Sequence, residues 1–171
     1  MNSVFYIASG VAVISTLLAI TRTNAVHSLL YMITSLLAGS VIFFVLGAPY
    51  VAALQTIVYA GAIMVLFIFV IMMLNQGGQA ALDERALASW RAWIGPGLLA
   101  GVLFAQMVLI ARGDGSWLPG DRIVEPKEVS LALFGPYILI IELASLLLLA
   151  GLVAAYHIGR REPDYHKDGR K

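Results

Sequence analysis

One long apolar run, residues 51–75 (VAALQTIVYAGAIMVLFIFVIMMLN), contains most of the groups that could do chemistry inside a membrane. Its first half carries the amide of Gln55, the hydroxyls of Thr56 and Tyr59, and the small cluster Ala60-Gly61-Ala62. The run has no charged residue, and about 20 apolar residues suffice for a helix to cross a bilayer core. A helix that only spans a membrane has little use for polar groups. We therefore treat this run as the candidate functional centre.

Glu142 is the one acidic residue in any of the apolar runs, and it lies on the last of them. On helical geometry it sits about 8 Å beyond Tyr137, in the outer half of that run. An intramembrane acid is costly and often marks a function. The alternative is a carboxylate that reaches water at the membrane edge. Both interpretations stay open.

His27 and His157 flank two apolar runs, so a bis-histidine haem site can be imagined. Single histidines at helix ends are more often interfacial residues, and we favour that interpretation. In the fourth run, we expect Gln106 to form a hydrogen bond with another helix.

Several chemistries are excluded by composition. The chain has no cysteine, which rules out thiolate-bound iron–sulfur clusters and zinc sites. It has no nucleotide-binding glycine motif, and its net charge of +1 gives no basic face for nucleic acid. No lysine occurs in an apolar run, whereas a proton pump needs several buried titratable groups. The chain therefore suits one part of a larger membrane assembly.

The composition indicates an integral membrane protein, with 60% hydrophobic and 12% charged residues in 171, about half the charge of a soluble domain. We predict an all-α fold with five transmembrane helices in a domain of residues 1–159, at 3–20, 28–46, 51–74, 93–111 and 137–156. Residues 47–50 should form a tight turn in which Pro49 ends any continuation of the helix, residues 112–131 a long connection, and residues 160–171 a polar cytoplasmic tail. The N-terminus lacks a basic signal region, so the first span should be retained.

Charge asymmetry predicts the orientation, because cytoplasmic loops carry excess Lys and Arg. One side would hold eight basic residues and the other three: Arg22, Arg85, Arg91, Arg160, Arg161, Lys167, Arg170 and Lys171, against Arg112, Arg122 and Lys127. The C-terminus should accordingly be cytoplasmic and the N-terminus periplasmic.

Flexible and bulky residues adjoin within the third span. Gly61 weakens the helix near Tyr59, and the bulky Met64, Leu66, Phe67 and Phe69 follow. Such a junction could store a π-bulge, and its conversion to a regular helix would rotate all that follows by roughly 100° per residue of register. Composition alone favours the alternative, an ordinary buried helix whose small residues allow close packing.

Three motifs resemble subunit J of bacterial NADH:quinone oxidoreductase, the respiratory complex I. They are NAVHSLLYMITSLLA (residues 24–38), IVYAGAIMVLFIFVIMMLN (57–75) and LFGPYILIIELASLLLLAGLVAAYHIGR (133–160). The resemblance implies a core membrane-arm subunit of an enzyme that couples electron transfer from NADH to quinone to proton pumping. It implies a bacterial inner-membrane location with subunits K and H as neighbours. FMN, iron–sulfur clusters and quinone would be bound by other subunits, and no cofactor by this chain.

The resemblance also implies a π-bulge at about residues 59–67 that opens and closes a water path for protons. Tyr59 and Gly61 would form the hinge, and Met64, Val65 and Phe67 the gate. Gln55 and Glu142 would be candidates for the proton path. Some relatives have glutamate where this chain has Gln55, an amide that bonds water but cannot carry a proton as a carboxylate does. The alternative is a purely structural linker without a gating role.

Overall fold

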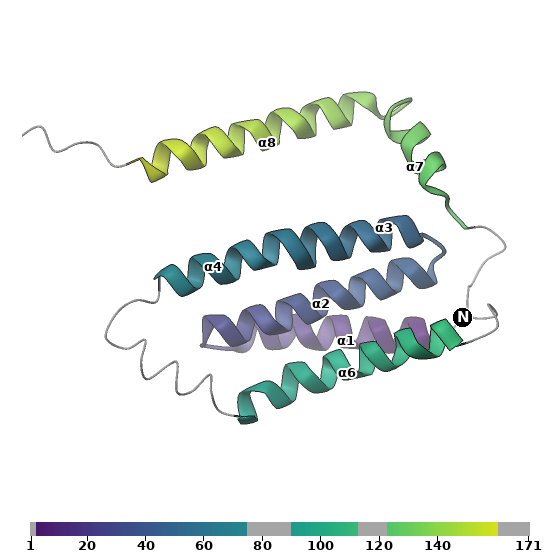
Figure 1. Ribbon diagram of the computed structural model, residues 1–171, viewed down its shortest axis with the longest axis vertical. Helices are drawn as coiled ribbons and strands as arrows, with labels where there is room; N and C mark the ends of the chain where they lie inside the picture. Colours follow the sequence, from purple (N-terminus) through teal and green to yellow (C-terminus); the bar gives the residue numbers. More distant parts are fainter. Residues whose placement is uncertain (1–2, 75–89, 113–122, 161–171) are drawn as a thin grey trace, which may run out of the picture. The chain divides into compact units, whose positions relative to one another are not determined.

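The computed structural model describes residues 3–74, 90–112 and 123–160, in which every regular element is a helix (Figure 1). In chain order they are α1 (Ser3–Thr21), α2 (Ala25–Val45), α3 (Pro49–Leu54), the π-helix η1 (Gln55–Ile63), α4 (Met64–Leu74), α6 (Trp90–Arg112), α7 (Pro126–Leu133) and α8 (Ile138–Gly159). Because α3, η1 and α4 are continuous, this described part contains five helices long and apolar enough to cross a membrane. The all-α fold class is confirmed.

Two connections differ from the prediction. Pro49 begins the third span, since its ring suits the first helical turn, and the preceding Gly47 makes the reversal with a φ of 83°. The predicted long connection at 112–131 contains a short helix, α7, which begins at Pro126 and has Glu128 in its first turn. The sequence signal was Pro126 itself, at the position where proline favours helix initiation. The predicted tail lies outside the described residues after Arg160.

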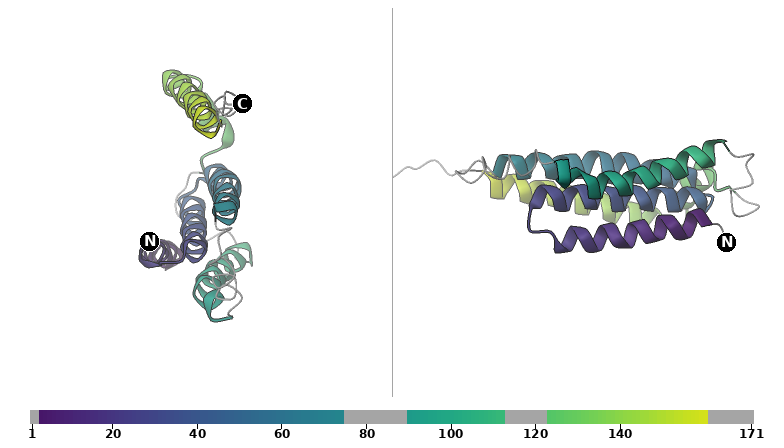
Figure 2. Two further views of the ribbon diagram at one scale, coloured as in Figure 1. Left: turned by 90° about the vertical axis from the view of Figure 1, so that its left-hand side faces the viewer. Right: turned by 90° about the horizontal axis from the view of Figure 1, so that it is seen from below.

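The chain divides into two units, residues 1–125 and 126–171. In the first, α2 is central and contacts α1, the third span and α6, and Figure 2 shows it end-on between α1 and the third span. In the second, α7 leads into α8 through a turn that a hydrogen bond from Tyr137 N to Ala132 O closes at 3.2 Å.

Small side chains bring α1 and α2 close together. Ala8 on α1 and Ala38 on α2 are completely buried, in a core shared with Leu103 of α6. Such close approach stabilises helix pairs in lipid, where dispersion contacts replace the hydrophobic driving force. Gln106 joins α6 to α1, because its Nε2 donates to Val4 O at 3.3 Å. The predicted interhelical bond of Gln106 is confirmed.

A tyrosine hydroxyl holds α2 against α6. Tyr31 is buried, its ring lies 5.7 Å from the Arg22 guanidinium carbon, and its hydroxyl occupies the space beside Gly95. A Cβ at Gly95 would collide with that hydroxyl and lie 3.1 Å from Tyr31 Cζ. An alanine at position 95 would therefore have to displace the Tyr31 hydroxyl.

We predict that Gly95→Ala destabilises the first unit by about 1–3 kcal/mol, the typical cost of overpacking. Thermal unfolding of the detergent-solubilised protein measures this loss. Tyr31→Phe in the same chain should restore part of it, since it removes the colliding oxygen. Gly97→Ala is the control, because a Cβ there meets nothing within 4 Å. Equal melting temperatures for Gly95→Ala and Gly97→Ala would contradict the prediction.

Candidate functional site

The third span changes its hydrogen-bond register in the middle. Nine residues, Gln55–Ile63, form a π-helix between the α-helical segments α3 and α4. At its end the N–H of Met64 bonds to Tyr59 O and Gly61 O. Both bonds pass over the Ala60 carbonyl, which would accept the Met64 N–H in a regular α-helix. The switch back to α-helix thus deprives one carbonyl of its usual donor.

Gly61 fits the crowded inner side of the π-helix. A Cβ on Gly61 would lie 3.3 Å from the carbonyl oxygen of Thr56, five residues earlier. That separation is tighter than most Cβ contacts, so a side chain at this position would have to displace the Thr56 carbonyl slightly. The resemblance implied a π-bulge at about residues 59–67; a π-helix is present in this span and overlaps that range at residues 59–63, but its bounds differ. The segment begins four residues earlier, at Gln55, and ends before Met64.

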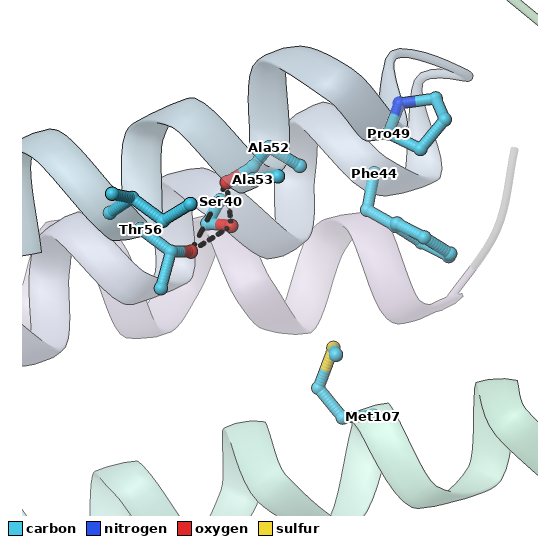
Figure 3. A pocket seen from close by; sticks show the side chains of 8 residues that line it. Ser40, Phe44, Pro49, Ala52, Ala53, Thr56 and Met107 are labelled. Carbon is cyan, nitrogen blue, oxygen red and sulfur yellow. Dashed lines mark hydrogen bonds between the residues drawn. The ribbon is translucent and has the colours of Figure 1, made fainter.

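The start of the π-helix is bonded to α2 through hydroxyl groups (Figure 3). Ser40 Oγ donates to Ala52 O at 2.7 Å. Thr56 Oγ1 lies 2.8 Å from Ser40 Oγ and 3.1 Å from Ala52 O. These groups line an open groove of about 370 Å³, which Met107 of α6 also borders. Sequence reasoning missed Ser40, whose only signal was a hydroxyl within an apolar run.

Gln55 lies at the first position of the π-helix and faces α2. Its side-chain Nε2 would be 3.7 Å from a Cβ built on Gly39, so the amide lies directly over that glycine. The side chain is half-buried. Its amide is a neutral group that can donate and accept hydrogen bonds. Gln55 and the Ala60 carbonyl are therefore polar groups of the same π segment.

The structure separates the predicted gate residues by direction. Met64 is 2% exposed, whereas Val65 is 60%, Phe67 49% and Tyr59 50% exposed. Met64 faces the interior of the first unit, and the other three present their side chains outward. A rotation of the helix by one residue of register would exchange an inward for an outward position.

The remaining candidates lie apart from this segment. Glu142 is in the second turn of α8, where Ser145 Oγ donates to its backbone carbonyl at 2.8 Å. It is exposed within its own unit, and whether it shares a path with Gln55 stays a prediction. His27 belongs to the first unit and His157 to the second; the interfacial interpretation of both stays a prediction, with haem as its untested alternative. In the described residues, no three His, Cys, Asp or Glu side chains are grouped as a metal site would require.

We predict that Gly61→Ala shifts the third span from the π to the α register. The new methyl would press on Thr56 O, and alanine also favours the regular helix by about 1 kcal/mol over glycine. The position of residues 55–63 in a density map of the variant measures the register. Gly39→Ala is the matched control, because its methyl makes an ordinary contact of 3.7 Å. A π-helix that persists unchanged in Gly61→Ala would show that the glycine does not set the register.

Comparisons with known proteins agree with the architecture. Residues 15–158 match the family described as NADH-ubiquinone/plastoquinone oxidoreductase chain 6. A Pseudomonas aeruginosa protein named NADH-quinone oxidoreductase subunit J is 53% identical over 95% of this chain and 98% of its own length. Relatives of the same name from Escherichia coli and Buchnera aphidicola are 50% and 48% identical, over 95% of this chain and 88% and 99% of theirs. The chain therefore belongs to the family of subunit J of NADH-quinone oxidoreductase, the respiratory complex I, and is a multi-pass membrane protein.

Proposed function

We propose that the third span is a gate for a proton or water path in the membrane arm of the complex. The observation that carries this proposal is the π-helix at Gln55–Ile63. Segments of this kind are rare and often occur at functional sites. This one lies within a span that has no charged residue. It therefore gates by its shape and exposed polar backbone, with no titration of a charged side chain.

The gate operates by a change of register. When i→i−5 bonds become i→i−4 bonds, the helix beyond the segment turns by about 100°. That turn moves Met64 out of its buried position and brings a neighbouring side chain in. Phe67 moves with it, since both residues lie on α4. A bulky side chain then enters or leaves the space beside the π-helix.

Water is the natural partner of the groups that the π-helix exposes. In hydrocarbon each backbone carbonyl must find a donor, and the Ala60 carbonyl is passed over by the Met64 N–H. A water molecule satisfies it in the π state, and the returning N–H replaces that water in the α state. Gln55 offers a second water site on the same segment. The wetting of the path thus follows the register of the helix.

The redox chemistry takes place in the rest of the complex. The chain has no cysteine to hold an iron–sulfur cluster and serves the translocase as a coupling part. FMN, iron–sulfur clusters and quinone are bound by other chains, and the neighbours of this one are the small subunit K and the chain that forms the quinone site. Glu142 supports the path from α8. The N-terminus is periplasmic and the C-terminus cytoplasmic, as the distribution of basic residues favours.

Gly61→Leu and Phe67→Ala test the gate in the assembled complex. Gly61→Leu should favour the α register, and Phe67→Ala should leave the path unblocked. We expect each to lower proton-coupled NADH:quinone turnover by about fivefold or more, which corresponds to about 1 kcal/mol. Turnover is measured together with proton uptake in vesicles, and assembly is checked by the amount of intact complex. Gly97→Ala serves as the control for a substitution in another span.

The competing function is a structural linker that joins helices of neighbouring subunits. In that case substitutions in the third span either prevent assembly or have no effect. Normal coupled turnover in both assembled variants would refute the gate and favour the linker.

A further inference from the structure

Two hydroxyl clusters of the same design join α2 to its neighbours on two sides. In the first, Thr16 Oγ1 lies 2.9 Å from Ala12 O and 2.8 Å from Ser35 Oγ, which itself lies 3.2 Å from Ala12 O. The second consists of Ser40, Ala52 and Thr56, as described above. In each cluster the serine belongs to α2 and the threonine to the neighbouring helix. Both hydroxyls approach the same alanine carbonyl, which lies four residues before the threonine. We call them the α1 anchor and the third-span anchor.

Each anchor is a directional contact. Two hydroxyls supply two protons, so the serine donates to the alanine carbonyl and the threonine to the serine oxygen or the same carbonyl. To separate the helices there, the serine would have to give up its bonds to the alanine carbonyl and the threonine, and in lipid no solvent replaces them. An anchor therefore resists rotation of its helix against α2.

The two anchored helices differ beyond the anchor. α1 continues as a regular α-helix from Ser3 to Thr21, whereas the third span enters the π register at Gln55, next to its anchor residue Thr56. Because the same cluster occurs in a regular helix, it is compatible with the α register. The anchor thus fixes the position of the helix without selecting its register.

The far half of the third span has no such contact available. Residues 64–73 read MVLFIFVIMM and carry only aliphatic, aromatic and thioether side chains. Their contacts with α2 are dispersion contacts, which are weak individually and have little directional preference. This half can turn against α2 by exchanging one apolar contact for another. No hydrogen bond of a strong side-chain donor has to break.

We propose that the Ser40–Ala52–Thr56 cluster is the fixed end of the moving helix. The register change then rotates only the part after the π segment, and residues 49–54 stay in place against α2. This inference rests on the proposed gate, and it identifies Ser40 and Thr56 as positioning residues that act through the helix.

A cysteine pair tests the fixed end directly, since the natural chain has no cysteine. Ser40→Cys with Thr56→Cys places two sulfurs where the hydroxyl oxygens are 2.8 Å apart. We expect the oxidised, cross-linked complex to keep at least half of the coupled turnover of its reduced form, and a gain also agrees with a fixed end because thiols are weak hydrogen-bond donors. The matched control is Thr16→Cys with Ser35→Cys, which cross-links the α1 anchor. A larger loss on oxidation of the first pair, restored by reductant and absent from the control, would overturn the proposal.

Removal of the hydroxyls gives the complementary test. Thr56→Val with Ser40→Ala removes the anchor hydroxyls, so residues 49–54 can turn as well. The rotation is then no longer confined to the part of the helix that carries Met64 and Phe67. We expect coupled turnover to fall about fivefold, the effect of one net hydrogen bond. Thr16→Val keeps normal turnover, because α1 is not part of the moving helix. Normal turnover of the Thr56→Val, Ser40→Ala complex would overturn the fixed end.

The outcome for Gly61→Leu separates this proposal from the gate itself. Impaired Gly61→Leu with a cross-linked pair that keeps its turnover supports both. If Gly61→Leu is impaired and the cross-linked pair loses its turnover, the gate is supported and the fixed end is refuted. Normal turnover of assembled Gly61→Leu and Phe67→Ala refutes the proposed gate, and the proposed fixed end with it.

Discussion

Hydrocarbon offers a backbone no hydrogen-bonding partner, and this constraint shapes every span of the chain. The spans satisfy their backbone groups internally as helices, and the third span does so even where it is irregular. In η1 the N–H groups move from one carbonyl to the next, so the helix remains bonded while its register differs. At the end of η1 the Met64 N–H bonds to Tyr59 O and Gly61 O and passes over Ala60 O. A membrane helix can change shape cheaply only in this way, by exchanging acceptors.

The central helix α2 combines two kinds of contact with different consequences for motion. Hydroxyl clusters bind it to α1 and to the start of the third span, and their directionality opposes rotation. Apolar contacts join it to α4, and these tolerate rotation because one methyl or ring can replace another. Gly61 lies between the hydrogen-bonded start of the third span and its apolar part, α4. The absence of a side chain there leaves room for the Thr56 carbonyl.

The distribution of polar groups suits a chain that belongs to a larger membrane complex. The third span supplies neutral groups, such as Gln55, that can order water. The acidic residue of the described spans, Glu142, lies on another helix, α8. Large apolar side chains such as Val65 and Phe67 remain exposed in the isolated chain. In a membrane, lipid or neighbouring subunits cover them.

Sequence alone determined the five spans, because a length of apolar residues is enough to specify a membrane helix. It also determined the family, through long motifs, and the absence of a thiolate-bound cofactor. It could not determine the start of the π-helix, which the resemblance placed at Tyr59, or the helix at Pro126. The i→i−4 and i→i−5 registers use the same residues and nearly the same number of hydrogen bonds. Local propensity therefore hardly distinguishes them, and the register becomes visible only in three dimensions, where the Met64 N–H bonds to Tyr59 O. Only the tertiary structure, likewise, brings Ser40 of α2 to Thr56 and Gly39 to Gln55, because these contacts join residues from different helices.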